Sequence, residues 1–446
     1  MQRVLGVETE YGLSARAGGR RLSAPEAAEL LFRPVVAEHR SANAFLGNGG
    51  RLYLDVGSHP EYATPECRSV RQVLVAERAG DELVARLAAR ASELAAEQGT
   101  DVRFRLFKNN VDSFGNSYGS HENYLVSREL DLVGAVDLLT PFLVTRQVLC
   151  GSGRLQRGEF RISQRADHLH DQLSALTTRA RPLVNTRDEP LADPARFRRL
   201  HVLAGDSNLA EPSALLKVGT MAAVLELVDR PEGPDARLAA LRLADPGAAL
   251  RQVARDPWAL LDLTDGRQLS AVDLQRAHLH LAGEQAEPGV AELWAEVLDA
   301  LAAHEPERVA DTVEWVAKRR LLEEFRHRHH LATDDPRLAQ LDLAFHELGG
   351  PFGLLESSGA VRRLTDPEDV QRALAEPPTG TRAVVRSAFL EAARRRGLRH
   401  SVDWQTCTVY DLPDAEGRPS DRTVLLADPL ATDSAELDVL LAAMTP

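Results

Sequence analysis

The N-terminal segment RVLGVETEYGLS alternates apolar and polar residues with a period of two. Because successive side chains of a β-strand point to opposite faces, the segment predicts a strand with Glu8 and Glu10 on one face. Leu5, Val7 and Thr9 belong to the other face. Two carboxylates about 7 Å apart on one strand face repel each other unless water or a cation separates them. The chain must therefore cover the apolar face of this strand and solvate or neutralise its acidic face.

A second segment, RLYLDV, alternates in the same way and predicts a strand with Arg51, Tyr53 and Asp55 on one face. Glu61 and Glu66 follow closely in GSHPEYATPEC. Mg²⁺ prefers oxygen ligands, usually a few carboxylates together with phosphate oxygens. We therefore expect a magnesium site where the two acidic strand faces meet. Solvated strand faces without a cation are the alternative that these residues leave open.

Two arginines in loop-like segments are candidates for binding phosphate: Arg165 in ISQRADH and Arg187 in VNTRDEP. A guanidinium group can hold phosphate oxygens with two hydrogen bonds, although most arginines form surface salt bridges instead. The sequence contains no GxxxxGK[ST] loop and no GxGxxG between a strand and a helix, which are the marks of P-loop and Rossmann sites. ATP would therefore bind through arginines and metal-carrying acids rather than through a glycine-rich loop.

The chain has 446 residues, of which 44% are hydrophobic and 27% charged, as is ordinary for a globular protein. It has no apolar run of membrane-spanning length, and acids occupy the place where a signal peptide needs its apolar stretch, so we expect a cytoplasmic protein. The net charge of −13 argues against a general nucleic-acid binder. Cys67, Cys150 and Cys407 lack metal-ligand spacing, and we expect reduced, mostly buried thiols.

Apolar periodicity and turn residues predict a large α+β domain followed by a small α+β domain of about 70 residues. The boundary is expected at the PPTG segment that begins with Pro377. Helices are predicted at residues 23–38, 81–98, 130–149 and 383–396 and over most of 210–328, strands at 102–108, 405–412 and 422–426, and a loop-rich stretch at 151–190.

Several long motifs stand out: GVETEYG, NGGRLYLDVGSHPEYATPEC, LFKNNVDSFGNSYGSHENYL, TPFLVTRQVLCGSGR, SQRADH, NTRDEPLADPARFRRLHVLAGDSN and VDWQTCTVYD. They resemble the Pup ligase and Pup deamidase family from Gly6 to about Leu430. The resemblance implies a glutamine-synthetase-like catalytic domain, residues 1–376, in which a curved, mostly antiparallel sheet backed by helices holds ATP and magnesium. It also implies that residues 377–446 form a small C-terminal α+β domain that completes the nucleotide site.

In this family the ligase uses ATP to phosphorylate the γ-carboxylate of Pup's C-terminal glutamate, and a lysine of a target protein then attacks to form an isopeptide bond. The deamidase converts a C-terminal glutamine of Pup to glutamate. LDVGSHPEYAT, the short segment 20–51 and the total length favour the ligase, whereas Ser120 in GSHENYL and the segment GSGR favour the deamidase. The resemblance implies Pup and lysine-bearing proteins as partners, and a monomer; neither nucleic acid nor a membrane is expected as a partner.

Three other functions stay open as alternatives to the ligase. They are the deamidase, an amide-forming enzyme that acts on a small amine, and an ATP-binding scaffold without enzymatic activity.

The resemblance also implies roles for individual residues. Magnesium is expected at Glu8, Tyr53 and Glu61, with Glu10 and His201 as additional ligands. The nucleotide is expected to contact Arg51, Thr64 and Trp404, and its phosphates Arg165 and Arg187. Asp55 matches the catalytic base.

The densest basic stretch, KRRLLEEFRHRHH, contains Arg319 and Arg326 two helical turns apart with apolar residues between them. Because Pup is acidic and largely disordered, a groove for it needs an apolar floor and a basic rim, and this stretch is a candidate. A solvated helix end, whose cations favour the helix dipole, is the alternative interpretation.

Overall fold

The computed structural model describes residues 3–112, 114–174, 181–414 and 416–444. Its centre is an eight-stranded sheet in the order β11–β12–β13–β8–β1–β6–β5–β4, in which only β11 and β12 are parallel. The strands are β1 (Leu5–Glu10), β4 (Asn43–Phe45), β5 (Arg51–Asp55), β6 (His59–Ala63), β8 (Ser120–Ser127), β11 (Asp171–Ser174), β12 (Pro182–Asn185) and β13 (Phe197–Val202). The predicted α+β class with a mostly antiparallel sheet is confirmed.

Strand β1 lies inside the sheet, between β8 and β6. Its residues Leu5 and Val7 are buried in the main hydrophobic core together with Tyr124 of β8. Glu8 and Glu10 alternate with them and lie on the opposite face. The predicted alternation is therefore confirmed, and the sheet has one face in the core and one face that carries acids.

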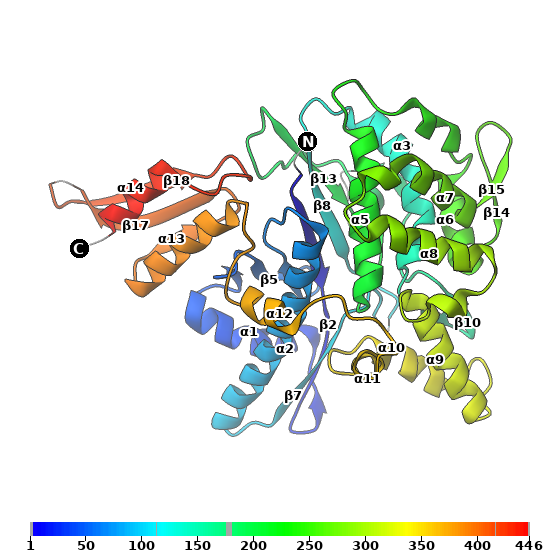
Figure 1. Cartoon of the computed structure of the whole chain (residues 1–446). Coiled ribbons are helices and arrows are strands. Elements are labelled where there is room, and N and C mark those ends of the chain that lie inside the picture. Colours follow the sequence, from blue (N-terminus) through cyan, green and yellow to red (C-terminus); the bar gives the residue numbers. More distant parts are fainter. Residues whose placement is uncertain (1–2, 113, 175–180, 415, 445–446) are drawn as a thin grey trace.

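Helices cover the apolar face of the sheet, and Figure 1 shows α3 and α5 to α8 gathered on one side of β8 and β13. The helices of this layer are α2 (Val70–Glu97), α3 (Leu132–Thr145), α4 (Gln147–Cys150), α5 (Glu211–Val228), α6 (Pro246–Arg255), α7 (Ala271–Ala282), α8 (Val290–Ala302) and α9 (Glu314–Arg328). Short 3-10 helices η1 (Ala166–His168), η2 (Ala236–Leu241), η3 (Gly283–Gln285) and η4 (Pro306–Val309) and the hairpin β14 (Leu260–Asp262)–β15 (Gln268–Ser270) connect them. The predicted helical character of 130–149 and 210–328 is confirmed.

Helix α1 (Ala24–His39) starts where it was predicted, because Ser23 and Glu26 form a capping box at its N-terminus. Helix α2 starts eleven residues before the predicted Asp81, at Val70. The Ser69 hydroxyl caps it by accepting a hydrogen bond from the backbone N–H of Gln72 at 3.2 Å. The buried face of its first turns includes the charged residues Glu77 and Asp81, which interrupt the apolar pattern on the core side of the helix.

A second, three-stranded sheet is formed by β2 (Gly12–Ala17), β3 (Arg20–Arg21) and β7 (Val102–Phe107), and β7 confirms the strand predicted at 102–108. The stretch 151–190, predicted to be loop-rich, contains the hairpin β9 (Arg154–Gln156)–β10 (Glu159–Arg161) as well as β11 and β12. These strands have three or four residues each, too few to show a period in the sequence. Helices α10 (Pro336–Phe345), α11 (Pro351–Ser357) and α12 (Pro367–Ala373) follow along the chain.

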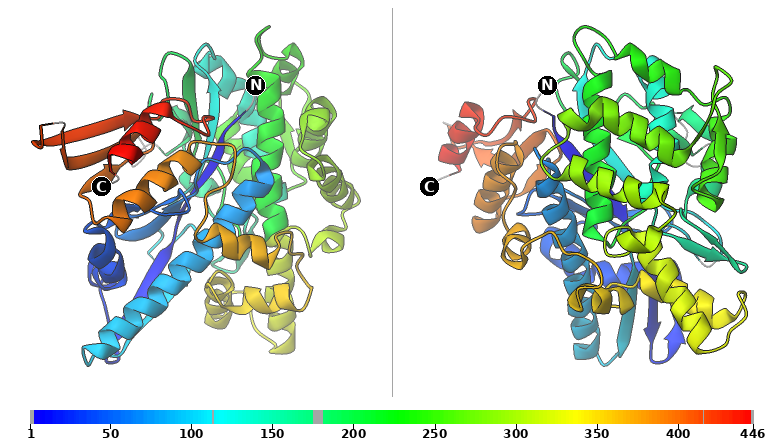
Figure 2. Two further views of the ribbon diagram at one scale, coloured as in Figure 1. Left: turned by 60° about the vertical axis from the view of Figure 1, so that its left-hand side comes forward. Right: turned by 45° about the vertical axis from the view of Figure 1, so that its right-hand side comes forward.

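The C-terminal segment contains α13 (Ala383–Arg395), β16 (His400–Val402), β17 (Thr406–Pro413), β18 (Pro419–Leu425) and α14 (Ala435–Ala443). Figure 2 shows these elements, in orange and red, projecting from one side of the molecule. They share a hydrophobic core of their own, which extends from Val385 to Met444. The basic helix and the two strands predicted here are confirmed, and β16 is an additional short strand.

All three cysteines are free and buried, as predicted. In the described part of the chain, no helix is both long and apolar enough to cross a membrane.

Candidate functional site

The acidic face of the sheet gathers side chains from five neighbouring strands. The register pairs Glu8 of β1 with His121 of β8, and Glu10 of β1 with Glu61 of β6. Tyr53 of β5 pairs in turn with Glu61. Side chains directly opposite each other in antiparallel strands lie about 5 Å apart, so this face brings the predicted metal ligands together.

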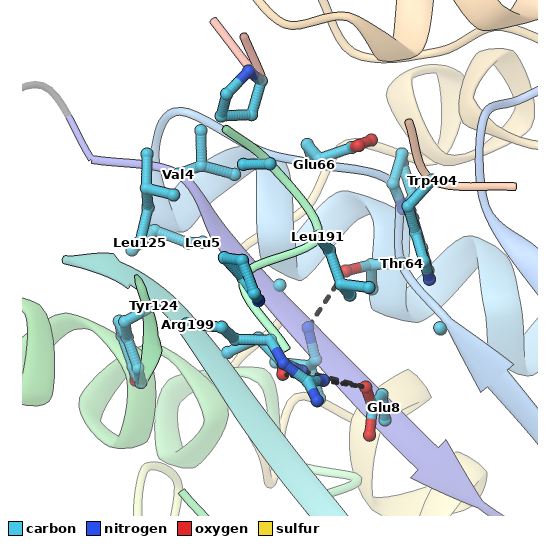
Figure 3. A pocket seen from close by; sticks show the side chains of 18 of the residues that line it. Val4, Leu5, Glu8, Thr64, Glu66, Tyr124, Leu125, Leu191, Arg199 and Trp404 are labelled. Carbon is cyan, nitrogen blue, oxygen red and sulfur yellow. Dashed lines mark hydrogen bonds and ion pairs between the residues drawn. The ribbon is translucent and has the colours of Figure 1, made fainter. Parts of the chain in front are cut away.

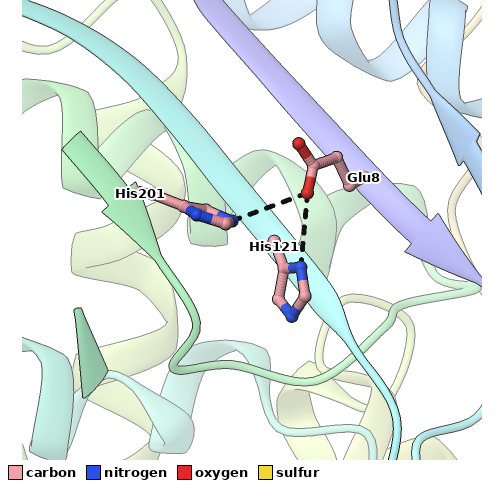
Figure 4. Close-up of side chains that lie close together, drawn as sticks. All are labelled: Glu8, His121 and His201. Carbon is pink, nitrogen blue, oxygen red and sulfur yellow. Dashed lines mark hydrogen bonds and ion pairs between the residues drawn. The ribbon is translucent and has the colours of Figure 1, made fainter. Parts of the chain in front are cut away.

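A first cluster consists of Glu8, His121 and His201, whose ligand atoms lie within 4.8 Å of one another (Figure 4). The Glu8 Oε2 atom lies 3.3 Å from Nδ1 of His121 and 3.5 Å from Nε2 of His201. Burial by itself would raise the pKa of Glu8, but the hydrogen bonds to the two imidazoles hold it well below its usual range. Burial lowers the pKa of His121, which favours the neutral imidazole that can bind a metal.

A second cluster consists of Glu10, Asp55 and Glu61, again with ligand atoms within 4.8 Å of one another. Burial and the nearby charges of Glu8 and Glu10 raise the pKa of Glu61 well above its usual range. Burial also raises the pKa of Glu10, and the charge of Asp55 raises it further. Buried carboxylates that repel each other in this way are stabilised in the ionised form by a cation between them.

Gly119 lies between the two clusters. Its backbone N–H donates a hydrogen bond of 2.7 Å to Oε1 of Glu10. A β-carbon at this position would lie 2.3 Å from Nε2 of His121 and 2.6 Å from Oε1 of Glu10. The imidazole of His121 therefore faces Glu8 with one nitrogen and the second cluster with the other.

His121 was not among the predicted ligands, although it lies as close to Glu8 as His201 does. In the sequence it stands in the short polar run HEN. The signal that was available is the alternation in β8: His121 and Asn123 share the face opposite to the buried Glu122. Asn123 donates a hydrogen bond of 3.2 Å to Glu8, so both residues of that face contact the first cluster.

Next to the first cluster lies a pocket whose lining is largely apolar (Figure 3). Glu8, Asn123 and Arg199 form its polar end, where Arg199 lies 3.6 Å from Glu8. Thr64 and Trp404, both predicted to contact the nucleotide, are among the lining residues. The remaining wall is mostly aliphatic and includes Val4, Leu5, Ala63, Pro65, Leu125, Leu191, Ala192 and Pro429.

The C-terminal segment is fixed beside this pocket by a buried ion cluster. Glu66 accepts hydrogen bonds from Arg382 at 2.9 Å and from Arg386 at 2.9 Å. Burial would raise the pKa of Glu66, but the two guanidinium groups lower it to about 2. Glu66 is therefore paired with the two C-terminal arginines and does not join the acids of the two clusters. Trp404 of the same segment packs against Phe45, and the centres of the two rings lie 5.0 Å apart.

The remaining predicted phosphate and nucleotide residues lie at different places around the face. Arg51 stacks on the ring of Tyr53, with 4.4 Å between the guanidinium carbon and the ring centre. Arg165 is buried, and its positive charge partly offsets the rise in the pKa of Glu10 in the second cluster. Burial lowers the pKa of Arg165 to about 10. Arg187 is exposed just after β12, where its backbone N–H donates a hydrogen bond of 2.9 Å to the side-chain oxygen of Asn185.

The basic stretch on α9 is largely neutralised by glutamates. Arg319 lies 3.3 Å from Glu307, and Arg326 lies 2.8 Å from Glu323. Leu322, which was expected to form part of an apolar floor, is buried in a small core instead. The structure therefore favours the interpretation of this stretch as a solvated helix end.

An antiparallel sheet face with two clusters of metal-ligand side chains beside an apolar pocket is typical of enzymes that hold a nucleotide polyphosphate through divalent cations. Residues 3–408 match the family model described as Pup-ligase protein. The chain belongs to the Pup ligase family.

Relatives and solved structures agree with this assignment. The Pup–protein ligase of Nocardia farcinica (strain IFM 10152) is 42% identical over 99% of this chain and 100% of the relative. That of Saccharomonospora viridis is 42% identical over 99% of both chains. The crystal structure of the complex between Pup and its ligase PafA matches with a TM-score of 0.90 and 39% identity, over 100% of this chain and 92% of that one. PafA in complex with ADP matches with a TM-score of 0.83 and 40% identity, over 95% and 94%.

Proposed function

We propose that this protein is a Pup–protein ligase, which uses ATP to join the γ-carboxylate of Pup's C-terminal glutamate to a lysine of a target protein through a γ-glutamyl phosphate. The observation that carries the proposal is the pairing of the two ligand clusters with the apolar pocket on one face of the sheet. The relatives of nearly equal length carry the ligase name, which favours the ligase over the deamidase.

The nucleotide fits the site with its base in the pocket and its phosphates over the clusters. Trp404 and the aliphatic wall offer an apolar surface for the adenine, and Thr64 lies on the same wall. Thr64 directly follows β6, and Arg51 on the neighbouring strand β5 offers a cation to the phosphates. In this proposal Arg165 holds phosphate oxygens beside Glu10, and Arg187 does so from the exposed end of β12.

Magnesium fits the donor sets of the two clusters. Glu8, Glu10 and Glu61 supply carboxylate oxygens, and His201 with His121 supplies imidazole nitrogens. The Tyr53 hydroxyl has a raised pKa because of burial and the charge of Glu8, so it would act as a neutral ligand. Magnesium, when bound, would neutralise the negative charge of the transferring phosphoryl group.

Asp55 is the proposed base for the attack by lysine. A lysine ammonium has an ordinary pKa of about 10.4 and cannot attack until it loses a proton. Asp55 is the least buried member of the second cluster, at the end of β5, so an incoming ammonium group can reach it. Its carboxylate can bind the ammonium and accept the proton as the amine attacks the acyl phosphate.

We further propose that residues 1–376 form the catalytic domain and residues 377–446 the small domain that completes the nucleotide site. The separate core of the C-terminal elements supports the division. Trp404 and Pro429 at the pocket support the role in nucleotide binding.

Incubation with ATP and two forms of Pup tests the function. We expect Pup ending in glutamate to give conjugates with a lysine-bearing protein and to release ADP and phosphate. Conversion of Pup ending in glutamine, without conjugate formation, would identify a deamidase instead. Product formation only with a small amine would identify a different amide-forming enzyme.

A further inference from the structure

Asp206 lies in the loop between β13 and α5, is only 1% exposed, and accepts four hydrogen bonds. Its Oδ2 accepts from the backbone N–H of Ser152 at 2.9 Å and of Gln164 at 3.0 Å. Its Oδ1 accepts from the Ser163 hydroxyl at 3.0 Å and from the backbone N–H of Arg165 at 3.2 Å. One carboxylate thus fixes the segment that ends in Arg165.

The side chain of Arg165 returns to the loop that contains Asp206. Its Nη1 donates to the carbonyl oxygen of Leu203 at 2.5 Å and, more weakly, to that of Gly205 at 3.4 Å. Gly205 has a φ of +125°, which few other residues adopt, and this turn directs the carbonyls of the loop. Backbone and side chain of Arg165 are therefore both held by residues 203–206.

A third loop closes the arrangement. Asn110 accepts a hydrogen bond from the backbone N–H of Ser207 at 2.7 Å, and its own N–H donates to Gln164 at 2.8 Å. The loops that contain Asn110, Gln164 and Ser207 thus meet at the end of the sheet where Gly119 binds Glu10. The position of Arg165 relative to Glu10 follows from this junction, which has Asp206 at its centre.

We infer that Asp206 is a positioning residue that orients Arg165 toward the phosphates of the nucleotide. The inference rests on the proposed function for the role of Arg165, but the orientation itself rests on the hydrogen bonds of Asp206. The four donors match the four lone pairs of a carboxylate. An amide supplies only one acceptor oxygen, so Asp206→Asn must lose the hydrogen bonds accepted by one of the two carboxylate oxygens. The Ser163 hydroxyl can turn to accept from the new NH₂ group, whereas the N–H of Arg165 cannot.

The test is a double-mutant cycle with Asp206→Asn, Arg165→Met and both together, measured as Pup-dependent ADP formation. We expect each single variant to lower kcat about tenfold or more while the KM for ATP changes less, since an oriented cation acts mainly on the transferring phosphoryl group. If Asp206 acts through Arg165, the double variant is as slow as Arg165→Met alone. Asp229→Asn is a matched control, because Asp229 is also buried and accepts from a backbone N–H, at the other end of α5.

Independent contributions, seen as multiplied losses in the double variant, overturn the inference, and so does a wild-type kcat for either single variant. Ser163→Ala removes one of the four bonds of Asp206, together with the hydroxyl that accepts from the N–H of Arg165 at 3.2 Å and of Ala166 at 3.3 Å. It replaces Asp206→Asn in the cycle if the latter does not fold. A crystal structure of the Asp206→Asn variant tests the orientation without any activity. Arg165 should leave the carbonyls of Leu203 and Gly205, and an unmoved guanidinium overturns the inference. Failure of the proposed function is distinct, because the wild type itself would then form no ADP with Pup.

Discussion

The backbone N–H of Gly119 donates to Oε1 of Glu10 at 2.7 Å, and a β-carbon on Gly119 would lie 2.6 Å from that same oxygen. Gly119→Ala must therefore displace Glu10 or His121, whose Nε2 would be 2.3 Å from the new methyl group. We expect nucleotide affinity in the presence of magnesium to fall at least about tenfold, because both clusters lose their geometry. Calorimetry with a non-hydrolysable ATP analogue measures this. Gly353→Ala, at a glycine of α11 with open space around it and no positive φ, controls for general effects of added methyl groups.

Asp55→Asn should nearly abolish conjugation, by about 10²-fold or more, and leave nucleotide binding largely intact. The amide keeps the shape of the carboxylate but cannot accept the proton of lysine at neutral pH. Rates of conjugate formation and the affinity for an ATP analogue should be measured on the same preparation. A variant that conjugates Pup at close to the wild-type rate would exclude Asp55 as the base.

Glu8→Ala and Glu61→Ala should each weaken nucleotide binding as well as turnover, because the proposed ions hold the phosphates. Titration with magnesium at a fixed concentration of the ATP analogue should show a higher magnesium requirement in both variants. Glu129→Ala, an exposed acid outside the two clusters, is the control. An unchanged magnesium requirement in both variants would place the metal elsewhere.

Trp404→Ala should raise the KM for ATP more than the KM for Pup, because an aromatic wall of the pocket is lost. Trp404 also packs against Phe45, so some loss of stability is expected as well. If Trp404 served only the core, its substitution would instead cost about 3–5 kcal/mol of stability and leave the KM for ATP nearly unchanged. Thermal unfolding measured alongside ATP kinetics separates the two roles.

Charge reversal at Arg319 and Arg326 together should change the affinity for Pup less than about twofold. Each arginine already has a glutamate partner, and Leu322 is buried between them rather than open to a ligand. Titration of labelled Pup against the double variant Arg319→Glu and Arg326→Glu measures the effect. A strong loss of affinity would restore α9 as part of the Pup groove.

The sequence predicted the parts of the site that depend on strand alternation. Glu8, Glu10 and Asp55 share one face because the period of two is fixed by strand geometry, and both segments show it clearly. His121 was missed because the strand that carries it follows a loop, and only the register of β8 with β1 reveals that it faces Glu8. The setting of Arg165 depends on three loops that meet in space, and no spacing along the chain encodes their hydrogen bonds with Asp206 and Asn110.

The pocket beside the first cluster is walled by Val4 and Leu5 near one end of the chain and by Trp404 and Pro429 near the other. During synthesis the two sides of this wall leave the ribosome several hundred residues apart, and the sheet with its acidic face can form before the second side exists. A truncated chain that ends before Arg382 would lack the partners of Glu66 that fasten the missing side. On the proposed function, incomplete copies of the protein would carry the acids of the site without one wall of the nucleotide pocket, so we expect only finished chains to hydrolyse ATP.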